Sequence, residues 1–229
     1  TCFRFDYYTA TGAEDVCNLT SSIGTSVLVW GDSHAAALLI GLRRKHRNIA
    51  HYTTRGCAPL LDYSANAITP YCTHNNNYAL DRIEDIKPAY VILHANWKPV
   101  SGKNELHLLD RTVSEIRSRS PGSKVVIIGG VPQWRPSLPD RILMQKIPLA
   151  VDSTLPTDLD QIADIDKKLK ERARALDISF ISLIQRFCKD GQCLAFSNED
   201  GLLEPVAWDY GHLTASGSKI AAKYILNRI

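Results

Sequence analysis

The sequence contains no apolar run long enough to cross a membrane. The longest run, residues 35–42, covers about two helical turns, whereas a spanning helix needs ~20 residues. Excess charge is also small, since 27 basic and 24 acidic residues leave a net charge of +3. Basic residues gather only within residues 43–47, as is typical of the last turn of a helix. These absences argue against membrane-spanning and nucleic-acid-binding functions.

Internal repeats, low-complexity tracts and a signal-peptide pattern are also missing. What is present suits one globular domain, with 229 residues of which 45% are hydrophobic and 22% are charged. This much apolar surface offsets the chain entropy lost on folding, which argues against dominant disorder. Because the chain opens at Thr1 rather than at a methionine, we expect a processed chain or an excised part of a longer one.

None of the 6 cysteines has the C-x-x-C spacing of a zinc ribbon or a thioredoxin motif. Many pairings are possible, and the sequence does not select one. Local pairing is the expectation, because the cysteines fall into three couples that are close in sequence: Cys2 and Cys17, Cys57 and Cys72, Cys188 and Cys193. The alternative is a set of reduced thiols in a cytosolic protein. We favour disulfides, and hence the periplasm or the cell exterior.

Short apolar segments alternate with amphipathic ones along the chain. The apolar segments predict buried strands over residues 26–30, 48–54, 89–94, 124–129 and 178–183. The amphipathic segments predict helices over residues 33–47, 77–86, 105–119, 160–176 and 214–228. This alternation predicts an α/β fold, a three-layer α/β/α sandwich with a five-stranded parallel sheet in flavodoxin-like order. In such folds the site lies at the carboxyl ends of the strands.

Two regions depart from this alternation. Residues 1–25 precede the first strand, and we expect an N-terminal extension that packs on a domain of residues 26–229. Residues 131–159 hold five prolines, too many for regular structure, and predict a loop insertion. A loop of this length in a compact domain is usually functional or mobile.

Ser33 follows the first predicted strand directly, in the run Trp30-Gly31-Asp32-Ser33-His34. This places a hydroxyl at a strand-to-helix turn, where the N–H groups of the new helix favour negative charge. Such a serine can attack a carbonyl and have the resulting oxyanion bound by its own N–H. The alternative is that Asp32 and Ser33 only cap the helix.

A second signal near the other end of the chain favours catalysis. Asp209-Tyr210-Gly211-His212 stands immediately before the last predicted helix. A spacing of three residues on a turn puts the aspartate and the histidine on one side. Asp209 can then orient the imidazole of His212, whose other nitrogen can take the proton of Ser33.

Gly31-Asp32-Ser33 together with Asp209-x-x-His212 resembles the SGNH (GDSL-like) hydrolase superfamily. The wider runs Trp-Gly-Asp-Ser-His-Ala-Ala-Ala, Gly56-Cys-Ala-Pro-Leu and His212-Leu-Thr-Ala-Ser-Gly resemble the SGNH domains fused to acyltransferase-3 membrane proteins of bacteria. Those proteins O-acetylate surface glycans such as the O-antigen of lipopolysaccharide. Residues 1–25 would then link the membrane part to this domain.

The resemblance also implies roles for individual residues. Ser33 matches the nucleophile, His212 the general base and Asp209 the residue that orients it. The oxyanion hole would use the N–H of Ser33, the N–H of Gly56 and the side chain of Asn96. Asn96 matches in position only, because the superfamily's G-x-N-D is absent, and its alternative role is that of a turn residue at a strand end.

Aromatic residues near the predicted cleft could stack on a sugar ring. We expect Trp97 and Trp134 to do so, with ordinary packing as the alternative. No His, Cys and Asp cluster has the spacing of a metal site, so no metal is expected.

These features predict a periplasmic O-acetyltransferase domain of an inner-membrane protein, acting on a bacterial surface glycan through a Ser-His-Asp triad. The alternatives are a carbohydrate O-acetyl esterase with the same triad and a non-catalytic glycan-binding domain. The resemblance implies that the acetyl donor, acetyl-CoA, is used by the membrane region and that this domain binds no cofactor. The expected partners are a glycan acceptor and an N-terminal acyltransferase-3 transmembrane domain of the same polypeptide. We expect no nucleic acid, and a monomer.

Overall fold

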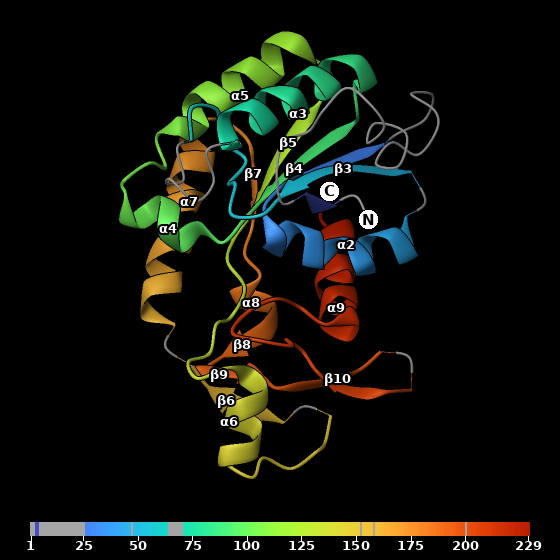
Figure 1. The fold of residues 1–229 in the computed structure, drawn as a ribbon, viewed down its shortest axis with the longest axis vertical. Coiled ribbons are helices and arrows are strands. Elements are labelled where there is room, and N and C mark those ends of the chain that lie inside the picture. Colours follow the sequence, from blue (N-terminus) through green and yellow to red (C-terminus); the bar gives the residue numbers. More distant parts are fainter. Residues whose placement is uncertain are drawn as a thin grey trace.

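A parallel sheet forms the centre of the molecule (Figure 1). The computed structural model describes residues 3–4, 26–46, 48–63, 71–151, 153–157, 159–199 and 201–229. The strands of the sheet follow the order β1-β3-β2-β4-β5-β7. Their bounds are Phe3–Arg4 for β1, Val27–Gly31 for β2, Ile49–Thr54 for β3, Tyr90–His94 for β4, Lys124–Ile128 for β5 and Ser179–Ile181 for β7. The five predicted strands are confirmed in flavodoxin-like order, and β1 adds an edge strand beside β3.

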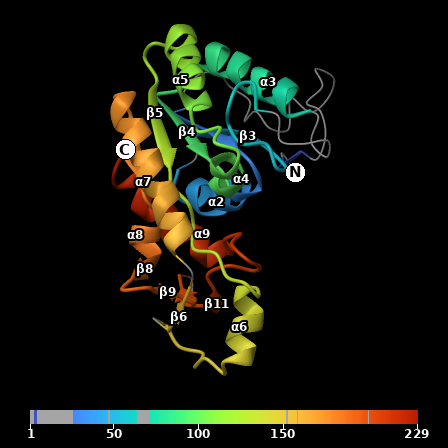
Figure 2. The same ribbon diagram turned by 90° about the vertical axis from the view of Figure 1, so that its left-hand side faces the viewer.

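Helices cover both faces of the sheet, which confirms the three-layer sandwich (Figures 1 and 2). One face packs against α3 (Cys72–Ile86), α5 (Leu108–Arg119) and α7 (Asp160–Ala175). The other packs against α2 (Ser33–Lys45) and α9 (Ala215–Leu226). Within β2, Leu28 and Trp30 belong to the first core, whereas Val27 and Val29 belong to the second. This alternation follows from the period of two of a strand with both faces buried.

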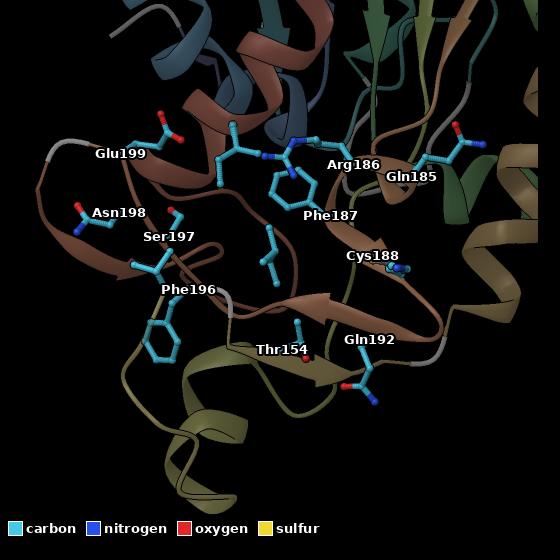
Figure 3. Close-up of a pocket in the computed structure, with 14 residues that line it drawn as sticks. Thr154, Gln185, Arg186, Phe187, Cys188, Gln192, Phe196, Ser197, Asn198 and Glu199 are labelled. Carbon is cyan, nitrogen blue, oxygen red and sulfur yellow. The ribbon is translucent and has the colours of Figure 1, made fainter.

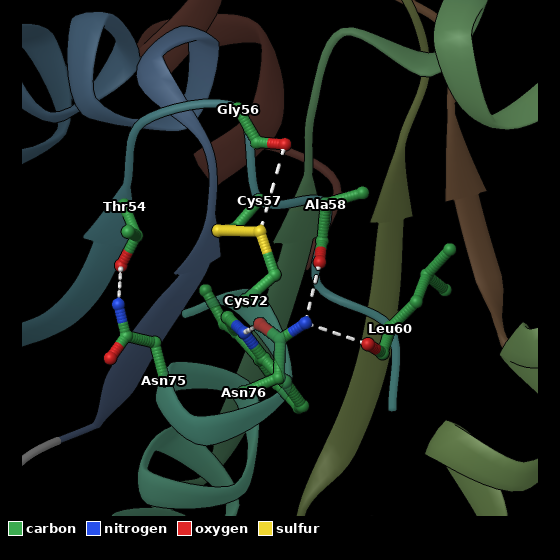
Figure 4. The surroundings of a disulfide bond; sticks show 9 residues. Thr54, Gly56, Cys57, Ala58, Leu60, Cys72, Asn75 and Asn76 are labelled. Atoms are coloured by element: carbon green, nitrogen blue, oxygen red, sulfur yellow. Dashed lines mark hydrogen bonds between the residues drawn. A yellow bond between two sulfur atoms is a disulfide. The ribbon is translucent and has the colours of Figure 1, made fainter. Parts of the chain in front are cut away.

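Helix α3 begins at Cys72, earlier than the predicted start at residue 77. Its first turns are held by buried polar contacts, which hydrophobic periodicity does not reveal. The Asn76 side-chain amide donates to the carbonyls of Ala58, at 2.9 Å, and Leu60, at 2.6 Å, and accepts from the indole of Trp30 at 2.9 Å (Figure 4). These hydrogen bonds give partners to two carbonyl groups of the loop after β3 that would otherwise be buried unpaired.

Two of the three expected cysteine couples are disulfides. Cys57 is bonded to Cys72, at the start of α3 (Figure 4), and Cys188 is bonded to Cys193. The first closes the loop that follows β3, and the second closes a tight hairpin. Cys2 and Cys17 lie outside the described residues.

The segment of residues 131–159 is more regular than predicted. It contains α6 (Leu138–Met144) and the short strand β6 (Thr154–Pro156). The prediction of irregular structure was wrong here. Ser137 caps α6, and Pro139 lies in the first turn of this helix. A backbone N–H in the first turn has no partner within the helix, so proline, which has no N–H, is tolerated there. Figures 1 and 2 show α6 and β6 at the end of the molecule opposite α3 and α5.

Several short helices and strands lie between and after the elements described above. Helix α4 follows β4, and α8 precedes a three-stranded sheet in the order β6-β9-β8. Strands β10 and β11 form an antiparallel pair that leads toward α9. The bounds are Trp97–Gly102 for α4, Ile184–Phe187 for α8, Cys188–Lys189 for β8, Gln192–Leu194 for β9, Phe196–Asn198 for β10 and Leu203–Pro205 for β11. Across the described ranges, no helix combines the length and apolarity that a membrane span requires.

Helices α2 and α9 pack closely at a glycine. A Cβ on Gly41 would lie 2.2 Å from the carbonyl oxygen of Ser218, so only glycine allows this approach. The Ser218 hydroxyl accepts from the Gly41 N–H at 2.7 Å and donates to the Leu38 carbonyl at 2.8 Å. Since α2 begins at Ser33 and α9 begins just after His212, this contact sets the distance between two distant parts of the chain.

Asp166 of α7 is a buried carboxylate that holds the segment after β5. It accepts from the Gly130 N–H at 2.9 Å and from the Ser182 hydroxyl. Burial raises the pKa of Asp166 from 3.8 to about 6, although both hydrogen bonds act in the opposite direction. Folding therefore favours the protonated acid.

This raised pKa predicts a stability that depends on pH. The contribution of Asp166 is fully present below its unfolded pKa of 3.8 and is lost as the pH rises through about 6. Asp166→Asn keeps an acceptor and a donor but does not titrate. In urea unfolding, wild type should lose about 3 kcal/mol relative to Asp166→Asn between about pH 4 and about pH 8. A difference that stays constant over this range would contradict the prediction.

Candidate active site

The turn between β2 and α2 presents Ser33 at the carboxyl edge of the sheet. Asp32 caps α2, since its Oδ1 accepts from the His34 N–H at 2.8 Å. Its Oδ2 accepts from the Asn96 N–H at 2.9 Å, which ties this turn to the one after β4. Burial raises the pKa of Asp32 to about 6, while the N–H groups of Asn96 and His34 partly counter this effect. Asp32 is thus the cap, and the Ser33 side chain remains available.

Ser33, His212 and Asp209 form one hydrogen-bonded chain, although Ser33 lies 179 residues from His212. His212 Nε2 lies 2.8 Å from Ser33 Oγ, and His212 Nδ1 lies 2.6 Å from Asp209 Oδ2. Because the carboxylate only accepts, Nδ1 carries the proton in this arrangement. In the neutral imidazole Nε2 is then an acceptor, and the Ser33 hydroxyl donates to it. The predicted spatial link between residues 33 and 212 is therefore present.

The loop that carries His212 is held by its own backbone. Asp209 Oδ1 accepts from the N–H of Gly211 at 2.9 Å and of His212 at 2.8 Å. The Trp208 N–H donates to the His212 carbonyl at 3.0 Å. The Asp209 carboxylate thus fixes both the backbone and the imidazole of the same residue.

The Asn96 side chain lies at the carboxyl end of β4, and its neighbours fix its orientation. Its Oδ1 accepts from the Gln133 side-chain amide at 3.1 Å and from the Lys98 N–H at 3.4 Å. These two donors leave Nδ2 pointing toward the hydroxyl of Tyr210, at 3.4 Å. Asn96 also caps α4, so the turn-residue interpretation and the donor interpretation describe the same side chain.

Comparison with known proteins shows the family of the chain. A family model described as "SGNH domain (fused to AT3 domains)" matches residues 1–227. The chain belongs to this family. No curated protein matches the chain in sequence.

Two solved structures share the fold of this SGNH domain. The periplasmic domain of a lipopolysaccharide acetyltransferase from Salmonella ser. Paratyphi A is 24% identical, with a TM-score of 0.81 over 99% of this chain and 90% of that chain. A carbohydrate acetylesterase family member from Sinorhizobium meliloti is 9% identical, with a TM-score of 0.51 over 88% of this chain and 95% of that chain. At these identities the likeness concerns the fold.

Gly56 of the SGNH domain lies in the turn after β3, at the same edge of the sheet as Ser33. Its φ of 65° is in the left-handed region that favours glycine. Strand pairing aligns Thr53, near the end of β3, with Gly31, just before Asp32. Among the described residues the Gly56 N–H has no hydrogen-bond partner, so it is available as a donor.

His34 and Tyr210 form a neutral pair beside the hydrogen-bonded chain of Ser33, His212 and Asp209. His34 Nε2 lies 2.9 Å from the Tyr210 hydroxyl. Burial holds the pKa of His34 well below its ordinary value, and the nearby His212 and His94 add to this. Burial, with Asp32 and Asp209, raises the pKa of Tyr210. The pair therefore carries no charge at neutral pH.

Trp97 and Trp134 do not line a cleft, so the prediction that they bind a sugar was wrong. Each is only 1% exposed. The Trp97 indole donates to the Ile128 carbonyl at 2.8 Å, and Trp134 belongs to the same buried core as Leu138 and Ile142 of α6. The exposed tryptophan is Trp208, at 61%, and its indole stacks on the His212 imidazole.

Sequence reasoning missed Gln133, Tyr210 and Trp208. The last two flank Asp209 directly, so their place beside the aspartate was a signal that could have found them. Gln133 gave no such signal, because it lies in the proline-rich segment and reaches Asn96 only through the fold.

A pocket of about 390 Å³ lies between α8, β9, β10 and α9, away from these contacts (Figure 3). Phe187, Phe196 and Ser197 are among its lining residues, and none of Ser33, Asp209 and His212 is. The hydrogen-bonded chain of Ser33, His212 and Asp209 therefore lies outside this pocket. In the part of the chain that the structure describes, no group of three or more His, Cys, Asp or Glu side chains could hold a metal ion.

Proposed function

We propose that this chain is the periplasmic O-acetyltransferase domain of a membrane protein and that it acetylates a hydroxyl of a bacterial surface glycan. The observation that carries the proposal is the chain of hydrogen bonds from Ser33 Oγ through His212 to Asp209. Family membership and the fold shared with a lipopolysaccharide acetyltransferase domain support it. By the same analogy, O-antigen of lipopolysaccharide is the proposed acceptor.

In the first half-reaction Ser33 takes up the acetyl group. Its Oγ attacks the carbonyl carbon of the donor while His212 Nε2 accepts the hydroxyl proton. The N–H groups of Ser33 and Gly56 and the Nδ2 of Asn96 bind the oxygen that becomes negative. His212 then returns the proton to the leaving group, and an acetyl ester on Ser33 remains.

In the second half-reaction a sugar hydroxyl replaces the donor. His212 removes its proton, the sugar oxygen attacks the ester carbonyl, and the Ser33 oxygen leaves with the proton from His212. If water attacks instead, the products are acetate and free enzyme, which is the esterase alternative. The two reactions share every step except the identity of this second nucleophile.

The membrane region of the same polypeptide is the proposed source of acetyl groups. The family description, a domain fused to AT3 domains, supports this partner. We propose that acetyl-CoA is used there and that the domain itself receives only the acetyl group. The disulfides Cys57–Cys72 and Cys188–Cys193 support placement in an oxidising compartment such as the periplasm.

A transfer assay tests the proposed function. The chain is incubated with p-nitrophenyl acetate and with de-O-acetylated polysaccharide from the lipopolysaccharide of the bacterium that encodes it. Acetate and glycan O-acetyl groups are both measured. We expect O-acetylated glycan in addition to acetate. Acetate alone would favour the esterase, and neither product would favour a binding domain.

Removing the Asn96 amide tests the third oxyanion donor. We expect Asn96→Ala to lower kcat for p-nitrophenyl acetate by about 10²–10³-fold with little change in KM, because the lost bond is made mainly in the transition state. The lost helix cap should cost only about 1 kcal/mol, which thermal unfolding will show. Asn227→Ala, at the far end of α9, is the matched control and should leave kcat unchanged. An unchanged kcat in Asn96→Ala would remove Asn96 from the oxyanion hole.

A further inference from the structure

Trp208 has an unusual combination of exposure and position. It is 61% exposed, whereas Trp30, Trp97 and Trp134 are each 1% exposed. Its indole stacks on the His212 imidazole, with ring centroids 5.2 Å apart and an interplanar angle of 20°. Within the described part of the chain, its indole N–H has no hydrogen-bond partner. A large apolar ring with an available donor thus lies in solvent directly beside the proposed base.

The geometry of His212 limits how an acceptor can approach. Both ring nitrogens are engaged within the ring plane, Nδ1 by Asp209 and Nε2 by Ser33. Trp208 covers one face of the ring, and the His34 ring lies 4.3 Å away at 34°. A hydroxyl that reaches Nε2 must therefore come in beside Ser33, and the group carrying it passes next to the indole.

We infer that Trp208 is the stacking platform for the acceptor sugar, an inference that rests on the proposed function. A pyranose ring presents C–H groups on one face and hydroxyls at its rim, and an exposed indole matches both through its apolar face and its N–H. Water has no such face to stack. Trp208 thus favours the sugar over water as the second nucleophile and determines specificity for transfer.

The loop around Trp208 suits this role. The hydrogen bond from the Trp208 N–H to the His212 carbonyl and the bridge between Ala207 and Leu213 hold its backbone. A platform fixed to the same loop as the base keeps the sugar hydroxyl in register with Nε2. A side chain held in advance loses little entropy on binding.

The ratio in which the acetyl-enzyme reacts with the glycan or with water tests this inference. Transfer and hydrolysis start from the same acetyl-Ser33, so their ratio at one glycan concentration reports only on the acceptor step. A structural effect of Trp208 on His212 slows both branches and cancels. We expect Trp208→Ala to lower the ratio of glycan acetylation to acetate release by about tenfold, the upper range for one stacked ring. Trp208→Phe should retain more of the ratio than alanine does.

Leu143→Ala is the matched control, because Leu143 is an apolar side chain 77% exposed on α6. It should leave the ratio unchanged. An unchanged ratio in Trp208→Ala would overturn the inference while the proposed function stands, since transfer would still occur.

Fluorescence quenching gives a readout that needs no turnover. Iodide should quench Trp208 selectively, because the three other tryptophans are buried. De-O-acetylated polysaccharide, added without donor, should protect wild type from iodide, and Trp208→Phe should lose the quenchable component. Absence of protection at saturating polysaccharide would overturn the platform. Protection without transfer would contradict the proposed function alone.

Discussion

Ser33→Ala should abolish both hydrolysis of p-nitrophenyl acetate and acetylation of the glycan, with a loss of about 10⁴-fold or more. Alanine cannot form the ester that both reactions share. The substitution removes one hydrogen bond, to His212, and leaves the capping role of Asp32 intact, so the fold should be unchanged. Rates of both reactions, circular dichroism and thermal unfolding check this expectation.

Mass spectrometry separates loss of the nucleophile from indirect effects. Wild type quenched during turnover should carry one acetyl group, and Ser33→Ala should carry none. Ser118→Ala is the matched control, because this exposed serine lies on α5, in the layer on the far side of the sheet from α2. Full activity in Ser33→Ala would end every catalytic interpretation of the site.

Gly31→Ala should lower the free energy of unfolding of the domain by more than about 4 kcal/mol. A Cβ on Gly31 would lie 1.8 Å from the carbonyl oxygen of His94 and 2.7 Å from the Cβ of Ala35. The His94 carbonyl cannot retreat, because Gly31 and His94 are partners in the pairing of β2 with β4. The substitution therefore forces the two central strands apart.

Gly102→Ala is the control for this effect. Gly102 ends α4, and a Cβ there would meet nothing within 4 Å. Its unfolding free energy should stay within about 0.5 kcal/mol of wild type or rise, since alanine favours helix. Urea unfolding followed by circular dichroism compares the two variants. Similar free energies of unfolding for Gly31→Ala and wild type would show that β2, β4 and α2 are not packed as described.

The glycine of the Gly31-Asp32-Ser33 motif is thus required by packing. The sequence suggested only that glycine ends the strand. In the structure it lets β2, β4 and α2 meet without a side chain between them, at the point where Asp32 bonds to the turn after β4. The motif combines close approach, a buried cap and an available hydroxyl in three consecutive residues.

The central sheet and the layers were predictable because both faces of its strands are buried. Apolar runs such as Tyr90–His94 have no alternative place in a folded chain. The main errors lay where other forces decide the structure. Buried amide contacts of Asn76 hold the start of α3, and Ser137 and Pro139 start α6 in a segment expected to be irregular.

The aromatic residues show the same division between local and tertiary information. Composition does not distinguish Trp97 and Trp134, which fill the core, from Trp208, which is exposed and stacks on His212. Exposure depends on which elements pack above a residue, and those elements come from elsewhere in the chain. The hydrogen bond by which Gln133 orients Asn96 also joins residues 37 positions apart in sequence, so it too depends on the tertiary structure.

The sequence by itself determined the order of strands and helices, the serine at a strand-to-helix turn and the Asp209–His212 couple, because hydrophobic period and short-range spacing are local properties. Only the tertiary structure decided that Ser33 and His212 meet at 2.8 Å, that the Asn96 amide faces Tyr210 and that the exposed ring of Trp208 lies beside His212. The contact between Ser33 and His212 depends on the packing of α2 against α9 at Gly41, which a linear pattern does not encode.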